Sequence, residues 1–173
     1  MKNLFKKIKK HNGFTLVEML LYVAISSTML IALVGGLSVV LESRVRNQVS
    51  SEVEQQGLQV MQIITQTVRN ADAINSPTAG NTASSISLKT FSTTTNPTIF
   101  NLSNGVVRIT EATGTPIDLT NSHVTVSNFS FQNLSRSGTT GTVRINFQID
   151  YLGGNSTKEY VFSKTFNGSA TIR

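Results

Sequence analysis

The chain has 173 residues, contains no cysteine and carries a formal net charge of +6. The lack of cysteine excludes disulfides, thiolate metal sites, a cysteine nucleophile and a lipid anchor attached through cysteine. The length predicts one compact domain with additional elements.

The positive charge is concentrated at the N-terminus. Residues 14–173 carry ten basic and nine acidic side chains, so this part of the chain is close to neutral. Basic residues interleaved with aromatic ones, as nucleic-acid binding requires, are not evident, and we expect no specific nucleic-acid site. The five basic residues of the first ten positions are Lys2, Lys6, Lys7, Lys9 and Lys10.

An apolar segment of membrane-spanning length follows these lysines. Residues 19–41 carry no charged side chain, and about 20 apolar residues are enough to cross a bilayer. A secretory signal peptide is the alternative, but its apolar core is usually about 7–15 residues long and ends at a cleavage site of small residues. The leader lysines outweigh Arg44 and Arg46, which predicts a single-pass protein with its N-terminus in the cytoplasm.

The helical pattern continues beyond this segment. Small and apolar residues recur at spacings of three and four between polar ones, which is the helical period. We therefore predict one helix from about Phe14 to Ala73, apolar all round in its first half and amphipathic in its second. A bend or break near Gly35-Gly36 or Glu42 is the alternative. The residues of the apolar stripe are Val49, Val53, Gly57, Val60, Ile64, Val68 and Ala71.

From Asn75 onward the period becomes two, which is typical of strands. The runs "TVRINFQIDY" and "KEYVFSKTF" alternate on either side of the turn "GGNS" and predict a hairpin. The alternation in "HVTVSNFSFQ" slips at Ser127-Asn128, which predicts a bulge or a strand break. Asn104-Gly105 predicts a tight turn. The expected fold class is α+β, in which the amphipathic half of the long N-terminal helix covers a C-terminal antiparallel β-sheet.

These patterns divide the chain into four segments. They are a basic leader at 1–13, a transmembrane helix at 14–41, an amphipathic helix at 42–74 and a β-rich head at 75–173. Glu18 is a lone carboxylate near the start of the apolar helix. An unpaired charge at the centre of a bilayer costs about 3 kcal/mol, and Glu18 lies nearer the edge, where the cost is smaller.

The stretch "GFTLVEMLLYVAI", which begins at Gly13, resembles the class III signal of type IV prepilins and pseudopilins. The resemblance implies that prepilin peptidase cleaves between Gly13 and Phe14 and that Phe14 is then N-methylated. It also implies that the new ammonium of Phe14 pairs with Glu18 of a neighbouring subunit during assembly. A long helix followed by a sheet is similar to the pilin architecture.

The same resemblance implies partners and a location. The partners would be the prepilin peptidase, other pilin or pseudopilin subunits, the inner-membrane assembly platform and, before assembly, membrane lipid. The protein would reside in the cytoplasmic membrane and then in a filament at the cell surface, serving a type IV pilus or a related type II secretion or competence system. No cofactor is implied.

Segments of the head resemble minor pilins and minor pseudopilins of the J/W type. The segments are "RNADAI", "LSNGVVRIT", "DLTNSHVTVSNFSFQ" and "FSKTFNGSATIR". This resemblance implies a low-copy subunit that primes or tips the filament. The alternative from another functional class is a membrane-anchored extracellular binding module or adhesin that does not enter a filament.

Small residues recur every four positions in the apolar helix, and such residues let membrane helices approach closely. Catalysis has little support in the sequence, because the acidic residues are scattered without a paired-carboxylate spacing, so we expect no enzymatic activity. The small residues proposed to pack against other helices are Ala24, Thr28, Ala32 and Gly36.

Overall fold

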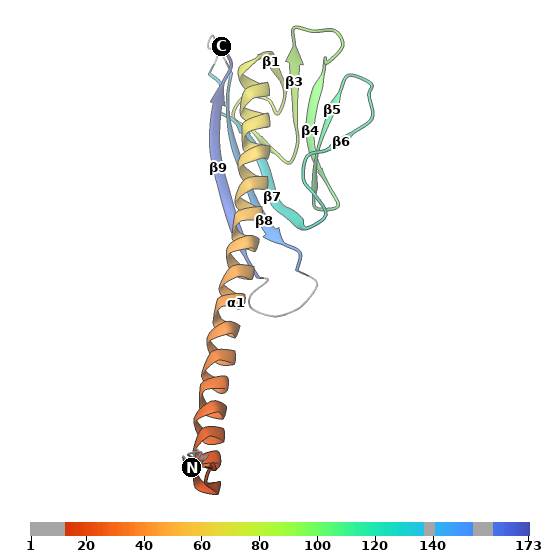
Figure 1. Ribbon diagram of the computed structural model, residues 1–173. Helices are drawn as coiled ribbons and strands as arrows, with labels where there is room; N and C mark the ends of the chain where they lie inside the picture. Colours follow the sequence, from red (N-terminus) through yellow and green to blue (C-terminus); the bar gives the residue numbers. More distant parts are fainter. Residues whose placement is uncertain (1–12, 137–140, 154–160) are drawn as a thin grey trace, which may run out of the picture. The chain divides into compact units, whose positions relative to one another are not determined.

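The computed structural model describes residues 13–136, 141–153 and 161–173. The chain divides into two units, Met1–Ser43 and Arg44–Arg173. Helix α1 (Leu16–Arg69) contributes to both units, and the described strands all belong to the second (Figure 1). We call this second unit, which includes its part of α1, the head. The fold is therefore α+β, as the sequence predicts.

In the first unit, α1 runs through Gly35 and Gly36 without interruption of its helical hydrogen bonding. The helical break considered at these glycines is therefore not present. All side chains described up to Arg44 are exposed, and most of them are apolar. Within the described part of the chain, α1 is the one helix long and apolar enough to span a bilayer.

In the head, one face of α1 is buried. The predicted stripe is confirmed from Val49 to Val68, and it packs against apolar side chains from both sheets in one continuous core. The period of the stripe places these residues on one side of the helix, so a single face is removed from water. The buried stripe consists of Val49, Val53, Gly57, Val60, Ile64 and Val68.

The helix ends at Arg69, four residues before the predicted end at Ala73. The Asn70 amide closes the last turn by donating to the Gln66 carbonyl at 3.1 Å. Residues Ala71–Ser76 then form β1, which pairs antiparallel with β3 (Ile86–Thr90). The backbone groups after Asn70 are thus satisfied by a strand ladder rather than by a helix. Ala71 is still buried, which explains why its spacing fits the helical stripe.

The strands form two antiparallel sheets, where a single sheet was predicted. The first has the order β1-β3-β4-β5-β6 and the second the order β2-β7-β8-β9. They separate because β1 pairs with β3 whereas β2 pairs with β7, and no ladder joins the two sheets in the described parts of the chain. Both sheets lie beside α1 (Figure 1). The remaining strands are β2 (Thr82–Ala83), β4 (Thr98–Ser103), β5 (Val106–Glu111), β6 (Ile117–Asp118), β7 (Val124–Asn133), β8 (Thr142–Tyr151) and β9 (Ser163–Thr171).

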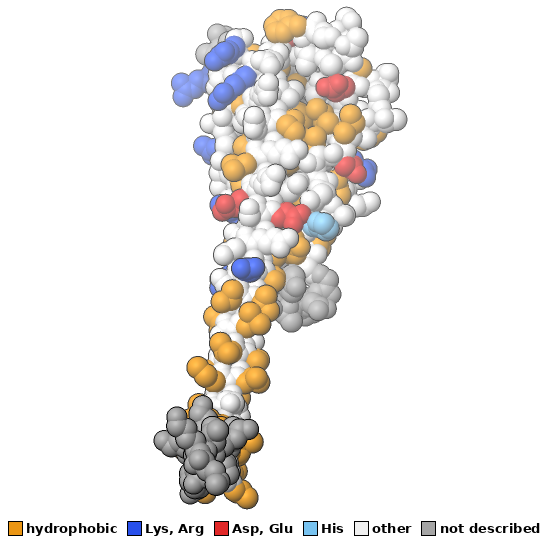
Figure 2. All heavy atoms as spheres, in the orientation of Figure 1, with side chains coloured by type: hydrophobic (Ala, Val, Ile, Leu, Met, Phe, Trp, Pro, Cys, Tyr) orange, Lys and Arg blue, Asp and Glu red, His pale blue; other side chains and the backbone are white. Residues whose placement is uncertain are grey.

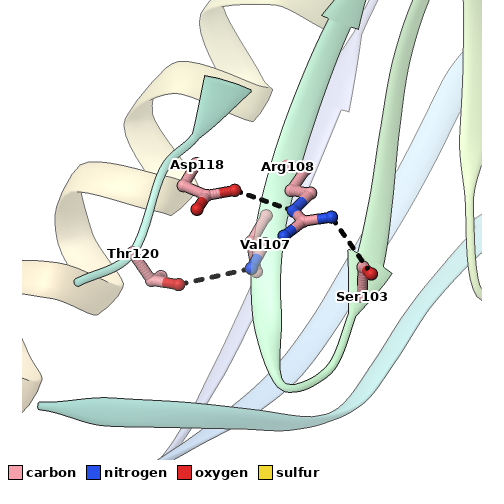
Figure 3. Close-up of polar contacts among 5 residues, drawn as sticks. All are labelled: Ser103, Val107, Arg108, Asp118 and Thr120. Carbon is pink, nitrogen blue, oxygen red and sulfur yellow. Dashed lines mark hydrogen bonds and ion pairs between the residues drawn. The ribbon is translucent and has the colours of Figure 1, made fainter. Parts of the chain in front are cut away.

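The tight turn predicted at Asn104-Gly105 is confirmed between β4 and β5. Both residues have positive φ, 51° and 78°, as a type I′ hairpin turn requires. Next to the turn, the Arg108 guanidinium donates to Asp118 at 2.7 Å and to Ser103 at 3.2 Å (Figure 3). These bonds tie β4 and β6 to β5, so Asp118 belongs to an ion pair at the sheet edge.

The predicted bulge in β7 is also confirmed. The register with β8 shifts between Ser127 and Ser130, and Asn128 has a φ of 53°. One residue is thereby left out of the alternation, so apolar side chains on both sides of the bulge point into the same core. The predicted pairing of β8 with β9 is confirmed as well, whereas the turn that joins them begins at Gly153 and continues outside the described residues.

Helix α1 and strand β9 approach each other at two glycines. A Cβ added to Gly57 would lie 2.0 Å from Cζ of Phe166, and one added to Gly168 would lie 2.6 Å from Sδ of Met61. Both distances are below van der Waals contact, so the close approach of helix and strand depends on the missing side chains.

We expect Gly57→Ala to destabilise the head by about 1–3 kcal/mol, because the new methyl group forces the Phe166 ring out of its site. Gly35→Ala is the matched control, since nothing lies within 4 Å of that position in the same helix. Chemical unfolding of the full chain in detergent, followed through the sheet signal in circular dichroism, measures both. A Gly57→Ala protein as stable as the parent would contradict this packing.

Glu52 of α1 is held by two residues that precede β7. The Asn121 amide donates to Oε1 of Glu52 at 2.9 Å, and Nδ1 of His123 lies 3.0 Å from the same oxygen. The Asn121 bond lowers the pKa of Glu52, desolvation opposes this, and His123 adds a further lowering through its hydrogen bond and charge. His123 is thus a hydrogen-bonded surface residue.

This contact predicts an acid dependence of stability. A lowered pKa in the folded state stabilises the head above the unfolded value of about 4.5, and this contribution is lost as pH falls through the folded pKa. Unfolding free energies measured from neutral to acid pH should fall less steeply in Glu52→Gln than in the parent. Glu111→Gln, at an exposed residue, is the control and should follow the parent. Identical slopes for the parent and Glu52→Gln would contradict the assignment.

Candidate functional site

The residues that carry the predicted processing site precede α1. Gly13, Phe14 and Thr15 are exposed and have no regular secondary structure, and the helix begins at Leu16, two residues later than predicted. The peptide bond between Gly13 and Phe14 therefore lies outside the helix. Its backbone can be reached without unwinding a helical turn.

Thr15 caps the start of α1. Its Oγ1 accepts a hydrogen bond from the Glu18 amide at 3.2 Å, and its carbonyl accepts one from the Met19 amide, also at 3.2 Å. A Thr followed three residues later by Glu is the sequence pattern of a capping box, and the threonine half of that box is formed here. Sequence reasoning did not single out Thr15, although this pattern was present in the sequence.

Phe14 lies against the helix that follows it. Its ring meets the ring of Tyr22 edge to face, with the centroids 6.1 Å apart. The Phe14 side chain is nevertheless 68% exposed. The contact therefore orients the Phe14 ring along α1. Most of the surface of Phe14 stays available to a membrane or another subunit.

The Glu18 carboxylate lies in the first turn of α1 and is exposed. A negative charge at this end of a helix is favourable because it complements the positive end of the helix dipole. Within the described residues, no side-chain hydrogen bond or ion pair reaches this carboxylate. The leader lysines lie outside the described residues. Glu18 can thus accept a cation from another chain.

The predicted packing stripe of α1 is exposed along its whole length. The hydroxyl of Thr28 donates to the carbonyl of Ile25 at 2.9 Å, so its polar group is satisfied within the helix. A Cβ at Gly36 would meet nothing within 4 Å. Close packing of another helix here remains a prediction. The stripe residues are Ala24, Thr28, Ala32 and Gly36.

Several acidic residues of the head have partners of their own. Asp72 pairs with Lys89 at 2.5 Å, and Asp150 accepts a hydrogen bond from Gln148 at 2.9 Å. Within the described ranges, no three His, Cys, Asp or Glu side chains are grouped closely enough to bind a metal ion.

A family model for the prokaryotic N-terminal methylation motif matches residues 8–34. Searches of curated proteins and of solved structures returned no significant match. The matched range contains the end of the leader, the Gly13–Phe14 bond, Glu18 and the first part of α1. The motif supports a type IV pilin- or pseudopilin-like substrate of prepilin peptidase. It implies two kinds of partner, which are the prepilin peptidase and other pilin subunits. The chain is therefore type IV pilin-like, with a prepilin methylation motif at the start of a long apolar helix.

Proposed function

We propose that the chain is a minor pilin or pseudopilin, inserted in the cytoplasmic membrane by α1 and then assembled through this helix into a filament. The filament belongs to a type IV pilus or to a related type II secretion or competence system. The observation that carries the proposal is the methylation motif at 8–34 on an exposed apolar helix. Such a helix needs lipid before assembly and protein afterwards, because its apolar surface is unfavourable in water.

In this proposal, prepilin peptidase cuts between Gly13 and Phe14, and the new N-terminus is methylated. Two features support the cut. Gly13 has no side chain to obstruct a protease at its backbone, and the bond precedes the Thr15 cap. Removal of residues 1–13 therefore leaves the helical hydrogen bonds of α1 intact.

After the cut, the ammonium of Phe14 lies at the positive end of the helix dipole, where a cation is unfavourable. Glu18 of a neighbouring subunit can compensate this charge, while the exposed carboxylate of Glu18 gains a cation. Charge-assisted hydrogen bonds of this kind are stronger than neutral ones and are weakly screened in a medium of low dielectric constant. The pairing also fixes the axial position of one subunit relative to the next.

The minor role rests on the likeness of the head segments to J/W-type subunits. A low-copy subunit at the start of a filament contacts the assembly platform in the cytoplasmic membrane and the first major subunits. The stripe from Ala24 to Gly36 would lie against their helices, because small side chains permit close approach.

Intact-mass analysis of the protein from cells tests processing. The expected mass is that of a chain that begins at N-methylated Phe14. Gly13→Val should leave the leader attached, because a branched side chain obstructs the peptidase, whereas Asn12→Ala should be cut normally. A parent protein that still begins at Met1 would overturn the pilin assignment and favour a membrane-anchored binding module. A protein that begins beyond Leu41 would also overturn it, because the apolar segment would have been removed.

Glu18→Gln tests assembly separately from processing. The amide keeps the size of the side chain but removes its charge, so we expect normal cleavage and at least about a tenfold loss of incorporation into filaments, which corresponds to about 1.4 kcal/mol. Sheared filaments probed with an antibody to the head measure incorporation.

Thr15→Ala is the matched control for that experiment. It removes the helix cap, which costs about 0.5–2 kcal/mol, but keeps the carboxylate of Glu18. We expect this variant to be incorporated. Equal incorporation of Glu18→Gln and parent would show that the charge does not serve assembly, and loss in both variants would point to the start of the helix instead.

A further inference from the structure

Strand β9 forms an open edge of the head. It pairs with β8 on one side and, within the described residues, with no strand on the other (Figure 1). The ladder with β8 is regular from Ser163 to Thr171, without a bulge. Unpaired strand edges attract other strands because their amide and carbonyl groups are available for pairing.

The register shows which backbone groups of β9 are free. The Ile172 amide donates to the Gly141 carbonyl at 2.8 Å, and the Tyr151 amide donates to the Phe162 carbonyl at 2.9 Å. Hydrogen-bonded and outward-facing residues alternate along an antiparallel strand, so even-numbered residues of β9 bond to β8. The residues whose amides and carbonyls point away from the sheet are Ser163, Thr165, Asn167, Ser169 and Thr171.

The other described edges are less open. Strands β2 and β6 each have two residues, and the register of β1 with β3 shifts twice. Short or irregular edges of this kind are common protection against unwanted pairing. The free residues of β9 are instead small, polar and exposed, without proline or charge. Among the described strands, β9 is therefore the one suited to accept another strand.

The face of α1 beside this edge carries an exposed apolar side chain. Going round the helix from Gly57, the next positions are Met61 and Glu54, which contact Gly168 and Lys164 of β9. Leu58 follows, is 62% exposed, and lies among polar neighbours on the open surface of α1. A strand added to β9 would place its inward side chains over Leu58.

Two arginines lie at the C-terminal end of β9. Arg173 follows the strand by two residues, and the Arg173 amide donates to the carbonyl of Arg69 at 3.3 Å. No carboxylate pairs with either arginine within the described residues, whereas at the other end Lys164 is paired with Glu54. Figure 2 shows basic side chains gathered at the end of the head where the chain terminates. The free edge is thus basic at one end and neutral at the other.

We propose that β9 is a docking edge for an extended acidic segment of a partner protein, which joins the second sheet as a fifth strand. Its backbone pairs with the outward groups of β9, an apolar side chain covers Leu58, and carboxylates at one end of the segment meet Arg69 and Arg173. Main-chain bonds supply affinity in this mode of recognition, and side chains supply specificity. The inference does not depend on cleavage at Gly13, so its test is separate from the tests of filament function.

The test uses the full chain in detergent and a fluorescein-labelled nine-residue peptide of alternating Thr and Val with two Glu at one end. Fluorescence anisotropy measures its dissociation constant. We expect saturable binding that weakens at least about tenfold with Asn167→Pro, because proline removes an outward amide but breaks no bond to β8. Asn167→Ala keeps the backbone amide and should bind the peptide within about twofold of the parent. This change in affinity is smaller than the change expected from losing one backbone hydrogen bond.

Two further measurements keep the test decisive if Asn167→Pro disturbs the fold. Arg69→Glu leaves the edge unaltered and should also weaken the peptide at least about tenfold, and so should replacing both Glu of the peptide by Lys. No saturable binding of the acidic peptide to the parent, or equal binding by Asn167→Pro and parent, would overturn the proposal. If the peptide does not bind and Asn167→Pro instead turns a dimer of the parent into monomers, the edge takes a second copy of this chain, which also overturns it.

Discussion

The apolar surface of α1 is the constraint on which the rest of this protein depends. In the head, the helix buries one face, including Val53, Val60 and Ile64, against the two sheets of its own chain. Before Arg44, the same helix has no cover within the described residues, although most side chains there are apolar. The chain therefore contains the means to fold its head but needs a second environment for the first part of its helix. In the proposed function, a membrane and then a bundle of other helices provide that environment.

Glu18 lies at the start of the helix, where two effects of its charge can be separated. As the third residue after the Thr15 cap, it is where a helix favours negative charge. In the proposed assembly, its exposed carboxylate also pairs with the ammonium that cleavage after Gly13 would create on a neighbouring chain. Local helix stability and subunit pairing are distinguishable because the cap and the charge belong to different residues.

The sequence predicts those parts of the fold that depend on local patterns. The stripe from Val49 to Val68, the turn at Asn104-Gly105 and the bulge near Asn128 follow from helical period, turn chemistry and strand alternation. The predicted end of the helix at Ala73 was wrong because Ala71 is buried in a strand. At this position, burial in a strand gives the same sequence spacing as burial in a helix.

Features that depend on the order of the strands could not be predicted from the sequence. The division into two sheets requires β2 to pair with β7, and the free edge of β9 emerges only when its neighbours are known. Thr15 is a different case, since its spacing from Glu18 was available in the sequence. For the processing site, the methylation motif supports the residues predicted around Gly13, whereas the contact made by Glu18 involves a second chain.

Zero-length cross-linking of assembled filaments tests directly whether Glu18 of one subunit contacts the N-terminus of another. A carbodiimide joins a carboxylate to an amine only when the two are in contact, and mass spectrometry of the digested filaments identifies the joined peptides. We expect a cross-linked peptide in which the carboxylate of Glu18 is bonded to the N-terminal amine of a different subunit. Recovery of Glu18 only unmodified, or joined to Phe14 of its own chain, would contradict it.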